Sequence, residues 1–241
     1  MSFPYLDETE GVRFPPLEEA TPEGIVAVGA NLSPGVLLSA YRQGIFPWYS
    51  GDEEPILWWS PDPRYVLFVK ELSVPRRLAR SLRKEPFAIS FDNDFPAVVH
   101  ACATVYRPRE HGTWITQDMA EAYTRLHELG YAHSVEARQE EKLVGGLYGV
   151  SLGGVFFGES MFPTKTDASK AAFVALCGSL GDHGISLIDC QMETPLLASF
   201  GARYIPRREF VRRIEEKLEK PTQRGSWESW GESSSPAWRL L

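Results

Sequence analysis

The sequence predicts an α+β fold, in which a small N-terminal domain precedes a larger domain built on one twisted, mostly antiparallel sheet. Three observations predict it. Residues 65–206 alternate β-rich and amphipathic segments and end in the order hairpin, helix, strand, helix, strand. The residues before about Asp62 are instead rich in Pro, Gly and Trp, which sets a boundary between domains 1–62 and 63–241. The 241 residues are 43% hydrophobic and 24% charged, an ordinary globular composition.

Capping residues and periodicity define the individual elements. In the N-terminal domain a helix is expected after Ser33, with Pro34 in its first turn and Gly44 after its end. The larger domain is expected to contain, in order, a strand at 65–69, a helix at 73–84, a strand at 87–92, helices at 95–103 and 116–129, a strand at 132–138, a hairpin of 142–152 with 155–162, a helix capped by Asp167, a strand at 186–192, a short helix at 194–201, a strand at 202–206 and a helix at 210–218. From Pro221 onward there is no periodicity, and 221–241 is expected to be a loose tail. The order of elements in the larger domain is also that of GCN5-related acyltransferases.

Charge and composition exclude several classes. With 25 basic and 32 acidic side chains the net charge is −7, which argues against a large unspecific nucleic-acid-binding surface. No apolar run is long enough for a membrane helix, and the N-terminus has no apolar signal segment, so we expect no membrane association and a cytoplasmic location. Three cysteines without a CxxC argue against a disulfide framework. The histidines show no metal-ligand spacing, and no P-loop motif is present, so no metal and no cofactor is expected.

Asp189 and Gln191 are the first candidate catalytic residues. In the strand expected at 186–192, alternation places both on one face and Ile188 and Cys190 on the other. A carboxylate beside an amide could orient and deprotonate an incoming nucleophile. The alternative is a strand end at which Asp189 only caps the next turn, and the spacing alone favours it.

Glu159 is an acidic residue in the otherwise apolar segment 156–162. A buried carboxylate needs a partner, and Gly158 beside it permits the close approach of a ligand or another backbone. The alternative is a position that faces solvent from an edge strand, and the pattern alone favours that alternative.

A one-sided group of basic residues marks the helix expected at 73–84. We call these residues the basic ridge; they lie opposite the apolar positions of the helix and are Arg76, Arg80, Arg83 and Lys84. Such a ridge could bind phosphates, although a solvated helix face is an equal alternative. Aromatic residues are the other feature of a nucleic-acid site, because their faces stack on exposed bases. Trp58 and Trp59 are adjacent, so at least one of them is expected in the core.

Several long blocks carry a resemblance to one known family. They are GIFPWYS, EPILWWSPDPR, HGTWIT, AYTRLHELGYAHSVE, LVGGLYGV, FFGESMF, ASKAA, LIDCQ and SFGARYIPRREF. In this order they resemble the leucyl/phenylalanyl-tRNA–protein transferases, and they span roughly residues 14–210. The first dozen residues and 226–241 match no family pattern.

The resemblance implies an aminoacyltransferase that moves Leu or Phe, and Met less well, from aminoacyl-tRNA to the α-amine of proteins beginning with Arg or Lys, which marks them for N-end-rule degradation. It implies a cytoplasmic bacterial enzyme with a small N-terminal domain and a C-terminal GCN5-related acyltransferase-like domain. We expect the chain to be a monomer and to use no cofactor. On the matching motifs, Trp48 and Trp114 would contact the terminal adenosine of the tRNA, and Glu159, Asp189 and Gln191 would line the reaction centre. The apolar side chains that could form the Leu/Phe pocket, or equally belong to the core, are Phe156, Met161, Phe173 and Ile188.

Two other functions are weighed against this one. A coenzyme A-dependent N-acetyltransferase needs a glycine-rich loop that grips pyrophosphate before a helix, and SMFPTKT before Asp167 has no such glycines. A non-catalytic RNA-binding module could use the basic ridge and the tryptophans, but it leaves Glu159, Asp189 and Gln191 without a role.

Overall fold

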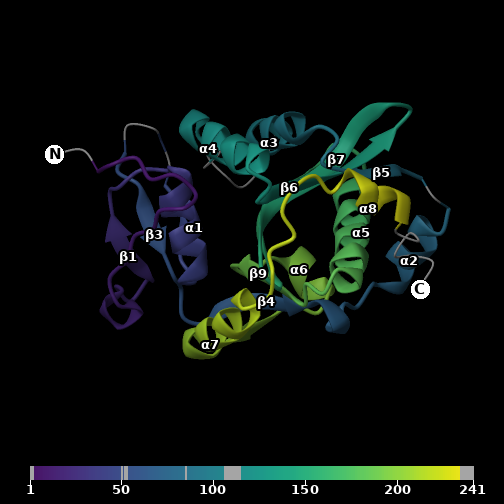
Figure 1. The fold of residues 1–241 in the computed structure, drawn as a ribbon. Coiled ribbons are helices and arrows are strands. Elements are labelled where there is room, and N and C mark those ends of the chain that lie inside the picture. Colours follow the sequence, from purple (N-terminus) through teal and green to yellow (C-terminus); the bar gives the residue numbers. More distant parts are fainter. Residues whose placement is uncertain (1–2, 50, 52–53, 85, 106–114, 234–241) are drawn as a thin grey trace.

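The computed structural model describes residues 3–49, 51, 54–84, 86–105 and 115–233 (Figure 1). It contains helices and two separate sheets, so the α+β class is confirmed. The smaller sheet and its helix α1 lie at one end of the molecule, and the larger sheet with the remaining helices forms the rest (Figure 1).

The N-terminal part is built around helix α1 (Pro34–Arg42), in which every residue from Pro34 to Tyr41 is buried. Ser33 precedes the helix as predicted, but its hydroxyl accepts the backbone N–H of Leu6 at 3.0 Å instead of capping the helix. Trp58 is fully buried and donates its Nε1–H to the carbonyl of Gly29, as expected for a core tryptophan. The other elements are a 3-10 helix at Leu17–Glu19 and an antiparallel sheet of order β1-β3-β2, with β1 Ile25–Val28, β2 Phe46–Pro47 and β3 Leu57–Trp59.

Over the described residues, the larger sheet has seven strands in the order β10-β4-β9-β8-β7-β6-β5. All neighbours are antiparallel except β8 and β9, which confirms the mostly antiparallel prediction. The strands are β4 Arg64–Phe68, β5 Ala88–Phe91, β6 Ala132–Gln139, β7 Lys142–Leu152, β8 Val155–Pro163, β9 Leu187–Gln191 and β10 Arg203–Ile205.

Helices cover both faces of this sheet. Helices α1, α3 and α4 bury their apolar sides in one hydrophobic cluster, and α5 buries its side in a second cluster across the sheet (Figure 1). The helices of the larger part are α2 Arg76–Leu82, α3 Phe95–Thr104, α4 Gln117–Glu128, α5 Ala168–Asp182, α6 Pro195–Ser199, α7 Arg207–Leu218 and α8 Glu228–Ser233, with a 3-10 helix at Val69–Glu71. Since α1 shares a cluster with the sheet, the N-terminal part packs directly on the larger one.

The predicted cap of α5 is corrected by the structure. Asp167 stands at the N-cap in the left-handed region, at φ 67°, and its side chain makes no capping hydrogen bond. Its carboxylate instead contacts Lys170 Nζ at 2.6 Å. The helix therefore begins where predicted, for a different reason.

The prediction of a loose tail is wrong for residues 221–233. Trp227 and Trp230 are 1% and 7% exposed. Their rings stack with His133 and His183 in one column, in which successive centroids lie 3.6, 3.8 and 3.7 Å apart. These partners are distant in sequence, so no local periodicity reveals the packing. Residues 234–241 lie outside the described part.

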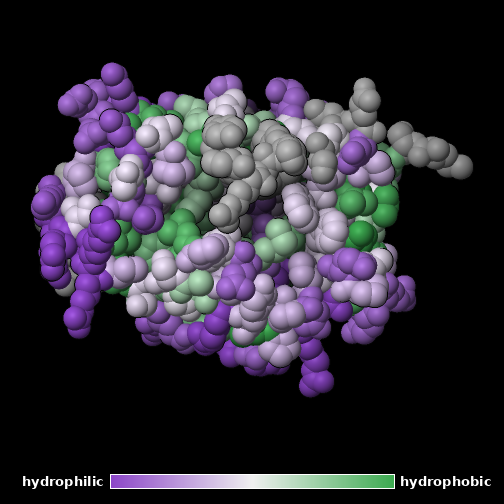
Figure 2. All heavy atoms as spheres, turned by 180° about the vertical axis from the view of Figure 1, so that it is seen from behind, coloured by the Kyte–Doolittle hydropathy of each residue, from purple (hydrophilic) through white to green (hydrophobic). Residues whose placement is uncertain are grey.

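The surface carries scattered apolar side chains. On the face seen in Figure 2, hydrophobic residues lie in separate groups among hydrophilic ones, as is ordinary for a protein surface. Within the described residues, no helix is both long and apolar enough to span a bilayer. Of the residues that the structure describes, the exposed large hydrophobic ones are Phe3, Tyr5, Val28, Met192 and Tyr204.

Candidate active site

The two parallel strands of the large sheet diverge in its centre. β8 and β9 pair only over Val155–Phe157 and Leu187–Asp189. Beyond this point β8 carries Glu159 and β9 carries Gln191. Glu159 sits at a bulge, because Gly158 and Ser160 pair with successive residues of β7 and leave Glu159 between them unpaired. Bulges re-aim side chains and are frequent beside active sites.

Glu159 is buried, and side chains hold its carboxylate. Tyr41 of α1 donates its hydroxyl to Oε1 at 2.8 Å, and Tyr123 of α4 donates to Oε2 at 2.8 Å. Gln191 Nε2 donates to Oε1 at 3.0 Å. This cluster corrects the interpretation of Glu159 as a solvent-facing group on an edge strand, since β8 is a central strand.

The hydrogen bonds of this cluster depend on the protonation of Glu159. The hydroxyls of Tyr41 and Tyr123 also lie 2.5 Å from each other. Three contacts among two phenols and one carboxyl need three protons, and the phenols supply only two. When Glu159 is protonated it can donate to one tyrosine, which donates to the other, and every contact then has its proton.

The pKa of Glu159 lies close to neutral pH. Burial raises the pKa of this carboxyl from 4.5 to about 7, and the negative charge of Asp189 adds to the rise, whereas the bonds from Tyr41, Tyr123 and Gln191 oppose it. Burial also raises the pKa of both tyrosines well above 10.0, so they remain neutral donors. Glu159 can therefore give up or take a proton near neutral pH.

Asp189 and Gln191 face the same side of β9, as alternation predicted. Asp189 is fully buried and binds Arg64 of β4 through two hydrogen bonds, from Nε at 2.8 Å and from Nη2 at 2.6 Å. Its Oδ1 also accepts the backbone N–H of Gln191 at 3.0 Å. This bond holds Gln191 at φ 61°, and its side chain reaches Glu159. Asp189 therefore does cap a turn, and the turn belongs to the site.

The predicted aminoacyl pocket residues lie around the same divergence, towards α5. Phe156 and Ile188 are register partners across β8 and β9, and both are buried in the cluster that includes Phe173 of α5. Met161 is partly buried against this cluster. The structure thus brings the four residues together on the sheet face opposite Glu159, and their role as a pocket stays a prediction.

The predicted tRNA contacts lie in two other places. Trp48 is half-buried, with its ring centroid 5.5 Å from that of Trp59. Trp114 lies outside the described residues. The basic ridge is exposed on α2 and just behind it, at the opposite end of the molecule from the N-terminal part (Figure 1).

Three residues of the site, Tyr41, Tyr123 and Arg64, are not among the site residues predicted from the sequence. The phenols of Tyr41 and Tyr123 lie on the apolar sides of their helices, and the need of a buried phenol for a hydrogen-bond partner is the signal that points to them. Arg64 stands at the start of a β-rich segment, where a buried position is rare for arginine. No local pattern connects it to Asp189, which is 125 residues away.

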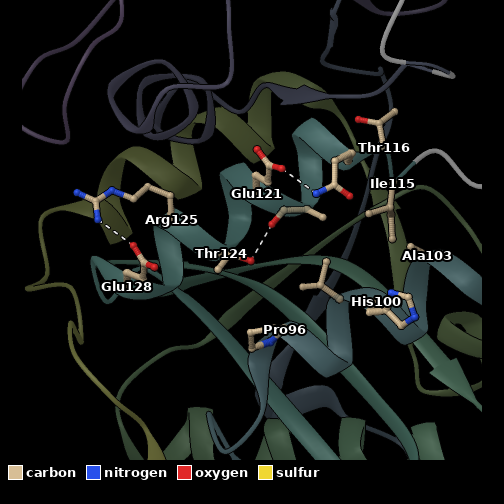
Figure 3. A pocket seen from close by; sticks show the side chains of 12 residues that line it. Pro96, His100, Ala103, Ile115, Thr116, Glu121, Thr124, Arg125 and Glu128 are labelled. Atoms are coloured by element: carbon tan, nitrogen blue, oxygen red, sulfur yellow. Dashed lines mark hydrogen bonds and ion pairs between the residues drawn. The ribbon is translucent and has the colours of Figure 1, made fainter.

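A groove of about 450 Å³ lies between α3 and α4 (Figure 3). Its α4 residues belong to a different face of the helix from Tyr123. Two of its charged groups are already engaged, Glu121 with Gln117 and Glu128 with Arg125. The groove is separate from the Glu159 cluster.

Among the described residues there is also no group of three or more His, Cys, Asp or Glu placed to hold a metal ion.

The chain is similar in sequence to a group of named proteins, whereas its similarity to a solved structure is weak. A solved structure, described as a functionally unknown conserved protein from Staphylococcus epidermidis, covers 60% of this chain and 57% of its own at 12% identity, and its TM-score of 0.39 is too low to carry an argument. Proteins named leucyl/phenylalanyl-tRNA–protein transferase are much more similar. One from Syntrophus aciditrophicus is 55% identical over 92% of both chains, and one from Syntrophobacter fumaroxidans is 54% identical over 95% of this chain and 97% of its own.

Models of one protein family match both the N-terminal part and the larger part of the chain. The one for the leucyl/phenylalanyl-tRNA protein transferase matches residues 66–215, and the one for its N-terminal domain matches residues 30–62. The matches include β8, β9, α1 and α4, and therefore every residue of the Glu159 cluster. With these matches and the identities above, the chain belongs to the leucyl/phenylalanyl-tRNA–protein transferase family.

Proposed function

We propose that this chain transfers leucine or phenylalanine, and methionine less well, from aminoacyl-tRNA to the α-amino group of proteins that begin with Arg or Lys, which marks them for N-end-rule degradation. The observation that carries the proposal is the buried Glu159, held by Tyr41, Tyr123 and Gln191 where β8 and β9 diverge.

This transfer needs a group that accepts the proton of the amine, but it does not need ATP. The aminoacyl ester is already activated. An α-amine has a pKa of about 7.7–8.0, so part of it is neutral at neutral pH. Its nitrogen attacks the ester carbonyl, the C–N bond forms, and the C–O bond to the tRNA ribose breaks. The proton lost by the amine passes to the Glu159 carboxylate and from there to the departing ribose oxygen.

Glu159 and Asp189 have different roles in this proposal. Both oxygens of Asp189 are occupied by Arg64, and one also accepts the N–H of Gln191. The sequence interpretation gave Asp189 the deprotonating role, whereas these contacts favour Glu159 as the proton acceptor. Asp189 then positions Gln191, and Gln191 positions Glu159.

The aminoacyl side chain is proposed to bind on the α5 side of the opening. Phe156, Ile188, Phe173 and Met161 present an apolar surface there. The reacting ester would lie between the diverging strands, within reach of Glu159 on the other face. This arrangement supports a pocket for unbranched or γ-branched side chains, since β-branched ones have a stiff χ1.

The tRNA is proposed to extend across the molecule. Its terminal adenosine would contact Trp48 and Trp114, and its backbone phosphates would contact the basic ridge Arg76, Arg80, Arg83 and Lys84. Because the ridge and the N-terminal part lie at opposite ends (Figure 1), a donor that contacts both must be long. A tRNA acceptor arm meets this requirement better than a small acyl donor does.

The two alternative functions are less well supported. The start of α5 carries Asp167, whose carboxylate disfavours the pyrophosphate of coenzyme A. If the chain were a non-catalytic RNA-binding module, the buried Glu159 at the bulge of β8, with its pKa of about 7, would have no role. The monomeric state and the cytoplasmic location stay predictions.

The test is transfer of labelled leucine from Leu-tRNA to a protein with an N-terminal Arg, without ATP or acetyl-CoA. The proposal expects labelled peptide-bonded product, and no product with an N-terminal Asp acceptor. Acetylation of the acceptor from acetyl-CoA, or tRNA binding without transfer, would contradict it. An acceptor with a blocked α-amine is the matched control.

A further inference from the structure

We propose that Arg64 is a positioning residue for aminoacyl transfer: it fixes the Asp189 carboxylate and neutralises its charge, so that Glu159 can be ionised and accept a proton at neutral pH. The inference rests on the proposed function, because it needs Glu159 as the proton acceptor.

Arg64 binds Asp189 in a geometry that only arginine can make. Its Nε and Nη2 form parallel hydrogen bonds to the two carboxylate oxygens, at 2.8 and 2.6 Å, and both side chains are 0% exposed. A lysine could supply the charge but not the planar fork. The carboxylate plane of Asp189 is therefore set by Arg64.

Two aromatic rings fix the plane of the guanidinium in turn. Its central carbon lies 4.6 Å from the ring centroid of Phe46 in β2 and 4.7 Å from that of Phe210 in α7. The remaining Nη1 has no hydrogen-bond partner among the described residues. The N-terminal sheet, strand β4 and helix α7 thus meet at one buried cation.

Stability does not explain this arrangement. A buried ion pair is costly to desolvate, and well-packed apolar residues of similar volume are often as stable or more so. An orphaned donor on Arg64 adds to the cost. The pair also touches the site directly, because Asp189 holds the backbone of Gln191, whose side chain holds Glu159.

The electrostatic consequence follows from the groups that face Glu159. They are Tyr41 of α1, Tyr123 of α4 and Asp189 of β9, with Tyr148 of β7 beside the tyrosines and Arg64 of β4 behind Asp189. The charge of Asp189 raises the pKa of Glu159. Without Arg64 that charge is no longer neutralised, and the pKa of Glu159 rises further.

The experiment is the pH dependence of kcat with both substrates saturating, for wild type and Arg64→Gln. We expect the acidic limb of the pH profile of kcat, where the rate falls as Glu159 is protonated, to move to higher pH by about one unit in Arg64→Gln. The KM for aminoacyl-tRNA should stay within about twofold of wild type. Arg64→Lys keeps the charge, so its limb should move less while its kcat still falls. A folded Arg64→Gln with the wild-type limb would overturn the inference.

Two further variants keep the test decisive. The double variant Arg64→Gln with Asp189→Asn leaves no unpaired charge, so it should fold, and its acidic limb should lie closer to that of wild type than the limb of Arg64→Gln does, because the charge of Asp189 is removed together with its partner. A double variant whose limb stays at the pH of the Arg64→Gln limb contradicts the inference. Arg203→Lys is the matched control for Arg64→Lys, since Arg203 also pairs with a carboxylate, that of Glu71, and lies over a ring, that of Phe68, but is exposed. Failure of wild type itself to transfer leucine would refute the proposed function instead.

Discussion

Two buried carboxylates on the same sheet are held in opposite ways. Asp92, just after β5, accepts the backbone N–H groups of Ser134 at 2.9 Å and Trp227 at 2.8 Å, and it contacts His133 Nδ1 at 2.8 Å. Within the described part of the chain, the donors to Glu159 are side chains, namely two phenols and one amide.

The difference indicates which acid is structural. Backbone donors cannot rearrange, so Asp92 remains a fixed acceptor that clamps the C-terminal segment onto the sheet. Burial lowers the pKa of His133 below 6.5, and the histidine stays a neutral partner. The donors of Glu159 are side chains, which can turn when the carboxyl gains or loses a proton, and beyond the paired residues Val155–Phe157 strand β8 no longer pairs with β9. A buried acid is thus a candidate for proton transfer when side chains hold it where strand pairing stops.

The largest expected effect comes from Glu159→Gln. An amide cannot accept the amine proton, so kcat should fall by about 10²–10⁴-fold, while aminoacyl-tRNA affinity changes little. The assay is single-turnover transfer of leucine, with binding measured separately. Loss of affinity with an unchanged transfer step would place Glu159 in substrate binding.

The same variant should become more stable relative to wild type at high pH. The pKa of Glu159 is raised, so its contribution to stability is complete below pH 4.5 and is lost as pH rises through about 7. Glutamine lacks this loss. Between pH 5 and pH 8 the stability difference should therefore move in favour of the variant by up to about 3 kcal/mol, measured by urea unfolding at both pH values.

Asp92→Asn should break the clamp and leave the chemistry intact. The NH2 of the asparagine side chain would face a backbone N–H that donates to the carboxylate in wild type, so this buried N–H is left without an acceptor. The loss of unfolding free energy should be about 2–3 kcal/mol, with kcat within about threefold of wild type. A loss of kcat comparable with that of Glu159→Gln, in folded protein, would remove the distinction between the two acids.

Tyr123→Phe should shift the protonation of Glu159 without abolishing it. The tyrosine hydrogen bond lowers the pKa of Glu159, so its removal should move the acidic limb of kcat to higher pH and reduce kcat at pH 7 by roughly tenfold. Tyr131→Phe is the control, because Tyr131 lies in the same hydrophobic cluster but is not bonded to Glu159. Equal pH profiles for the two variants would contradict the role of Tyr123.

The smallest effect is expected at the basic ridge. Arg76→Ala with Arg80→Ala removes two charges that the proposal places on tRNA phosphates, so KM for aminoacyl-tRNA should rise and its salt dependence should become less steep. Arg212→Ala is the control, since this arginine pairs with Glu216 on the same helix. Unchanged tRNA affinity in the double variant would show the ridge to be ordinary surface.

The sequence predicts much of the fold because its signals are local. Strand alternation places Asp189 and Gln191 on one face, and helical periodicity places Tyr41 and Tyr123 inward. The structure agrees on all four. What connects them is not local, because the partners of Glu159 come from α1, α4 and β9.

The failures have the same cause. The strand pattern alone favours an exposed Glu159, because a single strand does not reveal whether its neighbours cover it. The segment 221–233 was interpreted as loose because Trp227 and Trp230 have no period, although they stack on His133 and His183. Arg64 was overlooked since its partner Asp189 is 125 residues away.

The most direct test of the account is a pH titration of the Glu159 carboxyl itself. Infrared difference spectra of wild type and Glu159→Gln, recorded on protein with isotope-labelled glutamate, isolate its protonated and ionised bands. We expect a midpoint near pH 7, in place of the usual 4.5. A midpoint near 4.5 would show Glu159 to be ionised throughout the working range, and would contradict its role as the group that takes the proton of the acceptor amine.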